Sequence, residues 1–281
     1  NTQSAVRLLM RVDRALDFKD EKIHEAVEFA LSTLLKVQYP NGAWPQRFSA
    51  APDPDKFPVK KAGYPDKWSW TFPKRDYRSF YTFNDNTIAD TIATMLEAFD
   101  IYGDVRYQAA AEKAGDFIFL AQMPEPQPAW AQQYNADMHP AWARKFEPPA
   151  VTGGESQGVM RTLMELCRVT GKKKYLEPLP RALEYLRRSR LPDGRLARFY
   201  ELKTNKPLYF TREDYRLTYS DADMPTHYSF KTSYGVEGIA REYERLKNMD
   251  PADLKRPEKR SRPRLNRKLA AQTKLIIDQL D

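Results

Sequence analysis

The chain has 281 residues, of which 41% are hydrophobic, so it is long enough to build one large buried core. Its formal net charge of +8 favours an anionic partner, such as nucleic acid, a phospholipid surface or an acidic polysaccharide, although a merely soluble basic surface gives the same charge. No run of about 18 apolar residues occurs, which excludes a membrane span. One cysteine excludes an internal disulfide, and three scattered histidines argue against a zinc site.

Three segments with the same organisation, residues 1–42, 84–125 and 155–194, predict tandem helical hairpins. Each begins with a short polar cluster, continues as an apolar-periodic helix, breaks at a turn and resumes as a second helix. Two of them end at P-N-G or P-D-G, which are strong helix stops. We therefore expect an all-α fold, an incomplete (α/α) toroid with long loops and a few short strands. Three unrelated helix pairs in a bundle are the alternative.

The polar clusters that open the three segments predict a site. If the hairpins stack alike, the first helices run in parallel and their N-termini meet at one end. The clusters Asn1-Thr2-Gln3, Asn84-Asp85-Asn86 and Glu155-Ser156-Gln157 then lie together. Since each helix needs only one capping residue, we expect the surplus side chains to face a central cleft. A plain N-terminal capping box is the alternative interpretation of residues 84–86.

The segments between and after the hairpins differ in composition. Residues 43–83 and 124–154 are long loops with many Trp, Tyr, Pro, Lys and Arg residues, and loops of this length are usually functional. Strand-like alternation follows residue 195. From Lys247 onward the chain is basic, which predicts a mobile segment and a final helix. We therefore divide the chain into a toroid domain at 1–246 and a basic tail at 247–281, and in the tail a solvated charge run is the alternative to an anion site.

The expected cleft combines a carboxylate at Asp85 with amides, aromatic faces and arginines from the loops. Aromatic faces and hydrogen-bonding groups suit sugar rings, and the arginine fork suits carboxylates. An acidic polysaccharide satisfies both features as well as the net charge. Single-stranded nucleic acid is the rival, because stacking and basic residues suit it too, but the sequence carries no nucleic-acid-binding motif.

An ordered set of motifs over residues 1–235 resembles the family 10 pectate lyases. The motifs are VQYPNGAWPQRF, YTFNDNTIADTI, WAQQYN, PAWARKFEPPAVTGGESQGVMRTLM and RLARFYELKTNKPLYFTRED. The resemblance implies an incomplete (α/α) toroid and calcium-dependent β-elimination of polygalacturonate to unsaturated oligogalacturonides. It also implies a secreted or periplasmic monomer that binds acidic polysaccharide and neither nucleic acid nor membrane.

The same resemblance assigns roles to individual residues. Asp85 matches the family's calcium-binding aspartate, and Arg144 matches the proposed catalytic base. An arginine base is chemically demanding, because arginine is normally always protonated. Residues that match or lie nearest to the substrate-binding positions are Asn84, Trp130, Arg198, Arg212 and Lys231.

The chain also departs from the family pattern. The loop at 49–79 is longer than usual, and a second calcium-binding aspartate of the family belongs to a segment that would precede Asn1. These departures keep a second interpretation open, a non-catalytic binding protein for acidic polysaccharide on the same toroid.

Overall fold

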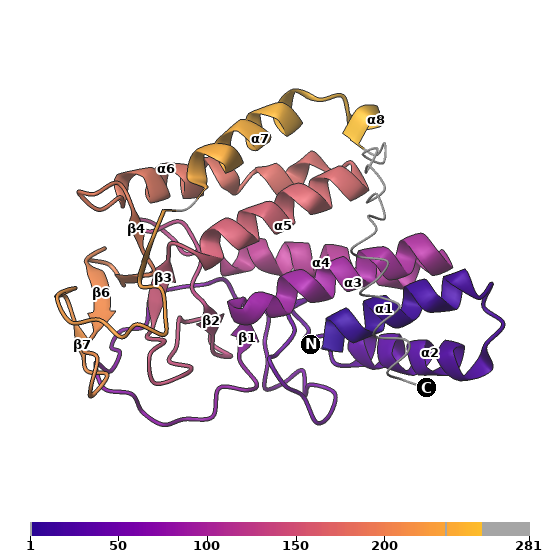
Figure 1. The fold of residues 1–281 in the computed structure, drawn as a ribbon, viewed down its shortest axis with the longest axis horizontal. Helices are drawn as coiled ribbons and strands as arrows, with labels where there is room; N and C mark the ends of the chain where they lie inside the picture. Colours follow the sequence, from indigo (N-terminus) through magenta and orange to yellow (C-terminus); the bar gives the residue numbers. More distant parts are fainter. Residues whose placement is uncertain (1, 234, 255–281) are drawn as a thin grey trace, which may run out of the picture.

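The computed structural model describes residues 2–233 and 235–254, and these form a helical array with short strands at one end (Figure 1). The α-helices are α1 (Thr2–Ala15), α2 (Glu21–Lys36), α3 (Thr87–Tyr102), α4 (Val105–Ala121), α5 (Glu155–Thr170), α6 (Leu179–Arg188), α7 (Val236–Asn248) and α8 (Pro251–Leu254). Two 3₁₀ helices are η1 (Asn84–Asn86) and η2 (Lys173–Leu176).

Local signals set the ends of the hairpin helices. The carboxylates of Asp20 and Asp104 cap α2 and α4, because each accepts a hydrogen bond from a backbone N–H in the first turn. Gly103 and Gly171 end α3 and α5 with φ of 71° and 72°, a left-handed conformation that glycine adopts at little cost. The tight turns that follow return the chain along the helix it has just left.

The three hairpins lie side by side. Helices α1, α3 and α5 run in the same direction, and α3 packs against both of the others (Figure 1). The second helices return beside them, and α7 covers α5 and α6. The buried apolar side chains form one continuous cluster that extends from α1 to α8. The expected incomplete (α/α) toroid is confirmed. The three hairpins are not unrelated helix pairs, because they stack in the same orientation.

Short antiparallel strands form at the end of the array where the first helices begin. The order β3-β5-β6-β7 makes one sheet, and the pairs β1-β2 and β4-β8 make two smaller ones. The bounds are β1 (Tyr81–Thr82), β2 (Gln133–Tyr134), β3 (Ala150–Thr152), β4 (Leu196–Ala197), β5 (Phe199–Glu201), β6 (Pro207–Phe210), β7 (Leu217–Thr218) and β8 (Lys231–Thr232).

A close approach at Gly153 joins this sheet to the helices. A Cβ atom on Gly153 would lie 2.4 Å from the carbonyl oxygen of Ala197, so only glycine fits between β3 and α5. The backbone N–H of Gly153 donates to the carbonyl oxygen of Arg198 at 3.1 Å. The first turn of α5 and the residue between β4 and β5 are therefore held next to each other.

The end of the described chain differs from expectation in one respect. Helix α7 continues through the proposed boundary at 247 and ends at Asn248, and Leu254 of α8 is buried against the core. The final helix and the rest of the basic tail lie outside the described residues, so the division into 1–246 and 247–281 stays a prediction. None of the helices within 2–233 and 235–254 has the length and apolar character needed to cross a bilayer.

Candidate active site

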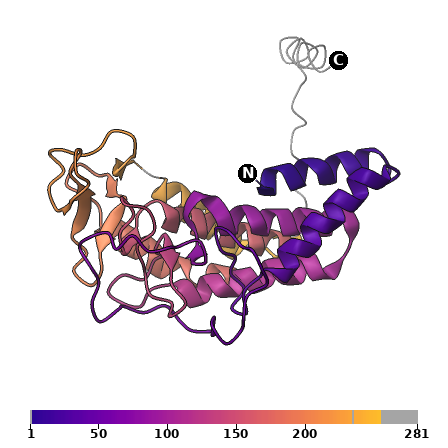
Figure 2. The ribbon, with the colours of Figure 1, turned by 90° about the horizontal axis from the view of Figure 1, so that it is seen from below.

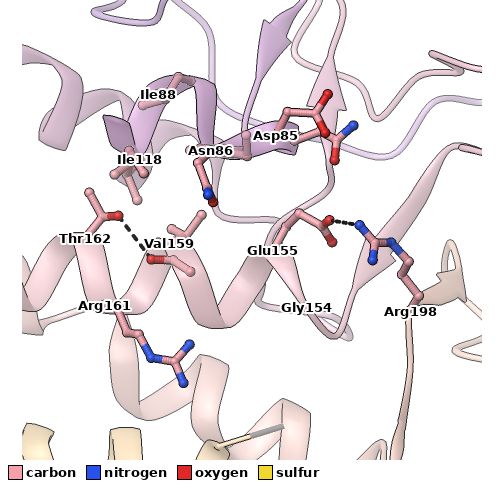
Figure 3. Close-up of a pocket in the computed structure, with 14 residues that line it drawn as sticks. Asp85, Asn86, Ile88, Ile118, Gly154, Glu155, Val159, Arg161, Thr162 and Arg198 are labelled. Carbon is pink, nitrogen blue, oxygen red and sulfur yellow. Dashed lines mark hydrogen bonds and ion pairs between the residues drawn. The ribbon is translucent and has the colours of Figure 1, made fainter. Parts of the chain in front are cut away.

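A pocket lies where the N-terminal ends of α3 and α5 face each other. Asp85 and Asn86 line one wall, and Glu155 in the first turn of α5 lines the other (Figure 3). Arg161 and Arg198 add positive charge to the same lining. The stacked hairpins thus bring the clusters at 84–86 and 155–157 together at the pocket. The first cluster does not join them, since neither Thr2 nor Gln3 lines the pocket, Gln3 bonds Thr91 on α3 instead, and Asn1 lies outside the described residues.

The third cluster supplies fewer side chains to this pocket than expected. Ser156 and Gln157 are buried, with relative exposures of 0% and 1%. The Ser156 hydroxyl bonds the backbone of Trp130, and the Gln157 amide donates to the carbonyl oxygen of Gly153. Their expected orientation toward a cleft is wrong, because they serve the packing of α5 instead.

The backbone of residues 84–86 accounts for the polar cluster. Asp85 and Asn86 have φ of 53° and 57°, in the left-handed region where Asp and Asn are the best tolerated residues besides glycine. Neither η1 nor α3 has a side-chain hydrogen bond at its cap. Instead, the Asp85 carboxylate accepts from Gln46 at 3.4 Å and from Arg144 at 3.3 Å. The capping-box interpretation is wrong, since these side chains point away from the helix they precede.

A buried carboxylate, Glu147, organises the neighbourhood of Arg144. Its side chain has no solvent exposure. Oε1 accepts from Asn84 Nδ2 at 2.8 Å, Arg144 Nη2 at 2.5 Å and Tyr228 Oη at 3.1 Å. Oε2 accepts from the backbone N–H of Arg144 at 3.1 Å. Glu147 therefore fixes both the backbone and the guanidinium of Arg144.

These contacts decide the protonation of Arg144. The hydrogen bond that Arg144 donates to Glu147, followed by the charges of Glu147 and Asp85, raises the pKa of Arg144 above its ordinary value against the opposing effect of burial. The guanidinium also lies 5.5 Å from the ring centre of Phe146. With these partners, Arg144 is a charged hydrogen-bond donor at neutral pH.

Arg198 is held on the opposite side of the pocket by a second carboxylate. Its Nη2 donates to Glu155 Oε1 at 2.6 Å, and its guanidinium lies 4.0 Å from the ring centre of Tyr228. Gln132 Nε2 links the two sides by donating to Glu155 at 2.8 Å and to the Tyr228 hydroxyl at 3.2 Å. Because the Tyr228 hydroxyl in turn donates to Glu147, one network connects Arg144 and Arg198.

The oxygen donors of the pocket suit a hard cation in part. Half of the Asp85 side chain is exposed (52%), and Oε2 of Glu155, across the pocket, is buried without a hydrogen-bond partner. Carboxylate oxygens are the ligands that calcium prefers. Within 2–233 and 235–254, however, no three Asp, Glu, His or Cys side chains cluster closely enough to hold a metal by themselves. A cation here would take further oxygens from the substrate.

The remaining predicted site residues lie outside this pocket. Trp130 has 0% exposure, and its indole N–H donates to the carbonyl oxygen of Ile118 in the core. Its predicted contact with substrate is therefore wrong in this structure, since close packing shields the whole side chain. Arg212 is exposed between β6 and β7 and pairs with Asp223 at 3.4 Å. Lys231 on β8 is 15% exposed and pairs with Asp221 and, at 3.8 Å, with Asp193.

Comparison with known proteins places these residues in a family. The family model of pectic acid lyase matches residues 2–195, a range that includes Asp85, Arg144, Glu147 and Glu155. The chain belongs to the pectic acid lyase family. Membership confirms the expected lyase resemblance and identifies the chain as a pectate lyase, so the interpretation as a non-catalytic binding protein is not supported.

Solved structures agree with the lyase fold. The family 10 polysaccharide lyase from Cellvibrio cellulosa superposes with a TM-score of 0.66 at 23% identity, over 88% of this chain and 79% of that one. A mutant of that lyase in complex with trigalaturonic acid gives 0.65 at 23% identity, over 87% and 79%. No curated protein matches the sequence.

Two groups that contact Arg144 or Arg198 have little or no signal in the sequence. Glu147 follows Arg144 by three residues in WARKFE, and this spacing, with a charge pair in a Pro-bounded loop, is the only local signal for it. Tyr228 has no such signal, because it reaches Glu147 across 81 residues of sequence. Glu155 was recognised only as part of a polar cluster, although it is the ion-pair partner of Arg198.

Proposed function

We propose that this lyase cleaves polygalacturonate by calcium-dependent β-elimination and releases unsaturated oligogalacturonides. One observation carries the proposal: Arg198 lines the same pocket as the half-exposed carboxylate of Asp85, which also accepts a hydrogen bond from Arg144 at 3.3 Å. The guanidinium of Arg198 matches a carboxylate of an acidic sugar chain, and the half-exposed carboxylate of Asp85 matches a cation. The solved complex of the Cellvibrio cellulosa lyase mutant with trigalaturonic acid supports this substrate class.

Arg198 is the proposed anchor for a galacturonate carboxylate. Its guanidinium is already oriented by Glu155 and by the face of Tyr228, so little further ordering is needed when a substrate binds. A planar fork can donate two parallel hydrogen bonds to one carboxylate. Arg212 and Lys231 are proposed to bind carboxylates of flanking sugar units, and Asn84 to position the site through Glu147.

Asp85 is the proposed protein ligand of calcium, together with oxygens of the substrate. A cation bound to the carboxylate beside C5 would delocalise the charge that develops when the C5 proton leaves. Asp85 now accepts a hydrogen bond from Arg144, so binding a cation there removes one of the two carboxylates that keep this arginine charged.

Arg144 is the proposed base. In the elimination, the C5–H bond breaks, its electron pair forms the C4=C5 double bond, and the C4–O bond to the next sugar breaks. The C5 proton passes to neutral Arg144, and the leaving oxygen takes a proton from water. Because Glu147 raises the pKa of Arg144, the neutral form is scarce at pH 7 and the rate should rise with pH. Since pectic polysaccharide is extracellular, we further propose that the enzyme is secreted or periplasmic. We also propose that it acts as a monomer.

The test is the ultraviolet absorbance of unsaturated uronide during incubation with polygalacturonate. We expect absorbance that grows with time, disappears with a calcium chelator and returns when calcium is added in excess. Shortening of the polymer without this absorbance would mean hydrolysis and would overturn the proposed reaction. Activity that survives exhaustive chelation would overturn the calcium assignment alone.

A further inference from the structure

An exposed group of aromatic side chains lies on the loop that is longer than usual in the family pattern. Trp68 and Trp70 stack with ring centres 5.6 Å apart and planes at 18°. The ring of Tyr219, from the segment after β7, meets Trp70 edge-on at 5.1 Å. Trp70 is 40% exposed and Tyr219 44% exposed. Large apolar side chains gathered at the surface indicate an interaction site, whereas single ones do not.

Hydrogen bonds with buried groups hold the Tyr219 ring and the backbone between the two tryptophans in place. The Tyr219 hydroxyl donates to Oε1 of Glu201 at 2.8 Å, and Glu201 is itself only 8% exposed. The indole N–H of Trp142 donates to the carbonyl oxygen of Ser69, between the two stacked tryptophans, at 2.7 Å. Both views show the long loop passing beside the β6–β7 end of the molecule (Figures 1 and 2). The aromatic surface is therefore preorganised.

A cation completes this surface, which we call the aromatic platform and define as Trp68, Trp70, Tyr219 and Lys206. The Nζ atom of exposed Lys206 lies 5.0 Å from the ring centre of Tyr219. Sugar rings present C–H groups on their faces, and the electron-rich faces of aromatic rings attract such groups. An ammonium group beside the rings adds attraction for a carboxylate. Rings and cation together select an acidic sugar.

The platform is structurally continuous with the proposed active site. Trp142, which binds the platform loop at Ser69, stands two residues before Arg144 and also packs against Phe72 of the same loop, with ring centres 5.8 Å apart. None of the platform residues lines the pocket at Asp85. The platform is therefore separate from the pocket and is joined through Trp142 to the segment that carries Arg144.

We propose that the aromatic platform is a remote binding site for the acidic polysaccharide chain, which holds units outside the reacting pocket. The inference rests on the proposed function for the identity of its ligand. The proposal predicts that the affinity for long chains depends on the platform. The affinity for a short oligomer that fills only the pocket should depend on it less.

The experiment compares Trp70→Ala and Tyr219→Ala with Phe29→Ala, a control that removes an aromatic ring 74% exposed on α2, away from the site. Retardation of each protein is measured in native gels containing polygalacturonate and a chelator, which stops calcium-dependent cleavage. We expect each platform variant to bind the polymer roughly fivefold more weakly than the parent, and the control to match the parent. In kinetic assays with calcium, KM for the polymer should rise more than KM for trigalacturonate.

Each result bears on the platform separately from the proposed reaction. Equal retardation of parent, platform variants and control would overturn the platform, as would a parent that the polymer does not retard. If the platform variants lose retardation by a neutral galactan as much as retardation by polygalacturonate, the assignment of an acidic sugar as the ligand would be overturned. A parent that cleaves nothing, while the platform variants lose retardation, would overturn the proposed function and support the platform.

Discussion

Replacement of Glu147 by glutamine tests whether this buried carboxylate governs the site. Glutamine keeps the volume of the side chain, but only one of its two terminal atoms, the amide oxygen, can accept a hydrogen bond. Its NH₂ group must then face a hydrogen-bond donor. That donor is either the backbone N–H of Arg144 or the group formed by Asn84, Tyr228 and the Arg144 guanidinium. A hydrogen bond to a charged group contributes about 1.5–3 kcal/mol. Because the Arg144 side chain is 33% exposed, solvent screens part of the ion pair, and we expect a loss of about 2 kcal/mol.

The assay is urea unfolding with the slope held to the parent value, run beside kcat on polygalacturonate. We expect a lower midpoint and a lower kcat for Glu147→Gln, because Arg144 loses the partner that orients it. The control is Glu177→Gln at an exposed position, which should stay within about 0.5 kcal/mol of the parent. A Glu147→Gln protein that matches this control in both stability and kcat would refute the reasoning.

Four further predictions follow from the site and from one contact far from it. Asp85→Ala should abolish calcium-dependent turnover and lower stability by only about 1 kcal/mol, because its side chain makes no cap hydrogen bond and the loss comes from placing alanine at a φ of 53°; calcium titration and thermal melting check both. Arg198→Lys should raise KM for polygalacturonate, because lysine keeps the charge but loses the fork. Arg144→Lys should lower kcat about a hundredfold and leave Kd for trigalacturonate nearly intact, and the parent kcat should rise with pH because neutral arginine is scarce. The hydrogen bond with Asp13 raises the pKa of His24 in the folded protein. The pair should therefore stabilise the fold fully below pH about 6.5, the ordinary histidine pKa, and this stabilisation should be lost as the pH rises through the pKa that His24 has in the folded state.

Each of these has an outcome that contradicts it. Retained calcium dependence in Asp85→Ala would remove the metal assignment, and an unchanged KM in Arg198→Lys would make that arginine a structural ion-pair residue. Weak binding with normal turnover at saturation in Arg144→Lys would leave it a substrate ligand only. For His24, the urea midpoint of the parent should fall between pH 6 and 8 relative to His24→Gln, and parallel pH profiles would refute the linkage.

The sequence by itself determined the hairpins, because their signals are local. Apolar side chains recur at the helical period, and capping aspartates such as Asp104 and terminal glycines such as Gly103 act within one turn of the chain. Stacking of equal hairpins then predicts that the polar clusters meet at one end, and two of the three, at 84–86 and 155–157, do so. The ordered motifs, read as a resemblance, added the family.

Only the tertiary structure decided which polar groups bond to one another. Glu147 joins Asn84 across 63 residues of sequence, and no periodic pattern specifies a contact made by three loops packed together. The burial of Trp130 and the exposure of Trp70 were equally unreadable, since both are tryptophans in loops rich in aromatic residues. Which of the two faces water depends on how helices and strands from distant parts of the chain cover those loops. That covering is fixed by the packing of the whole core, and a local segment carries no record of it.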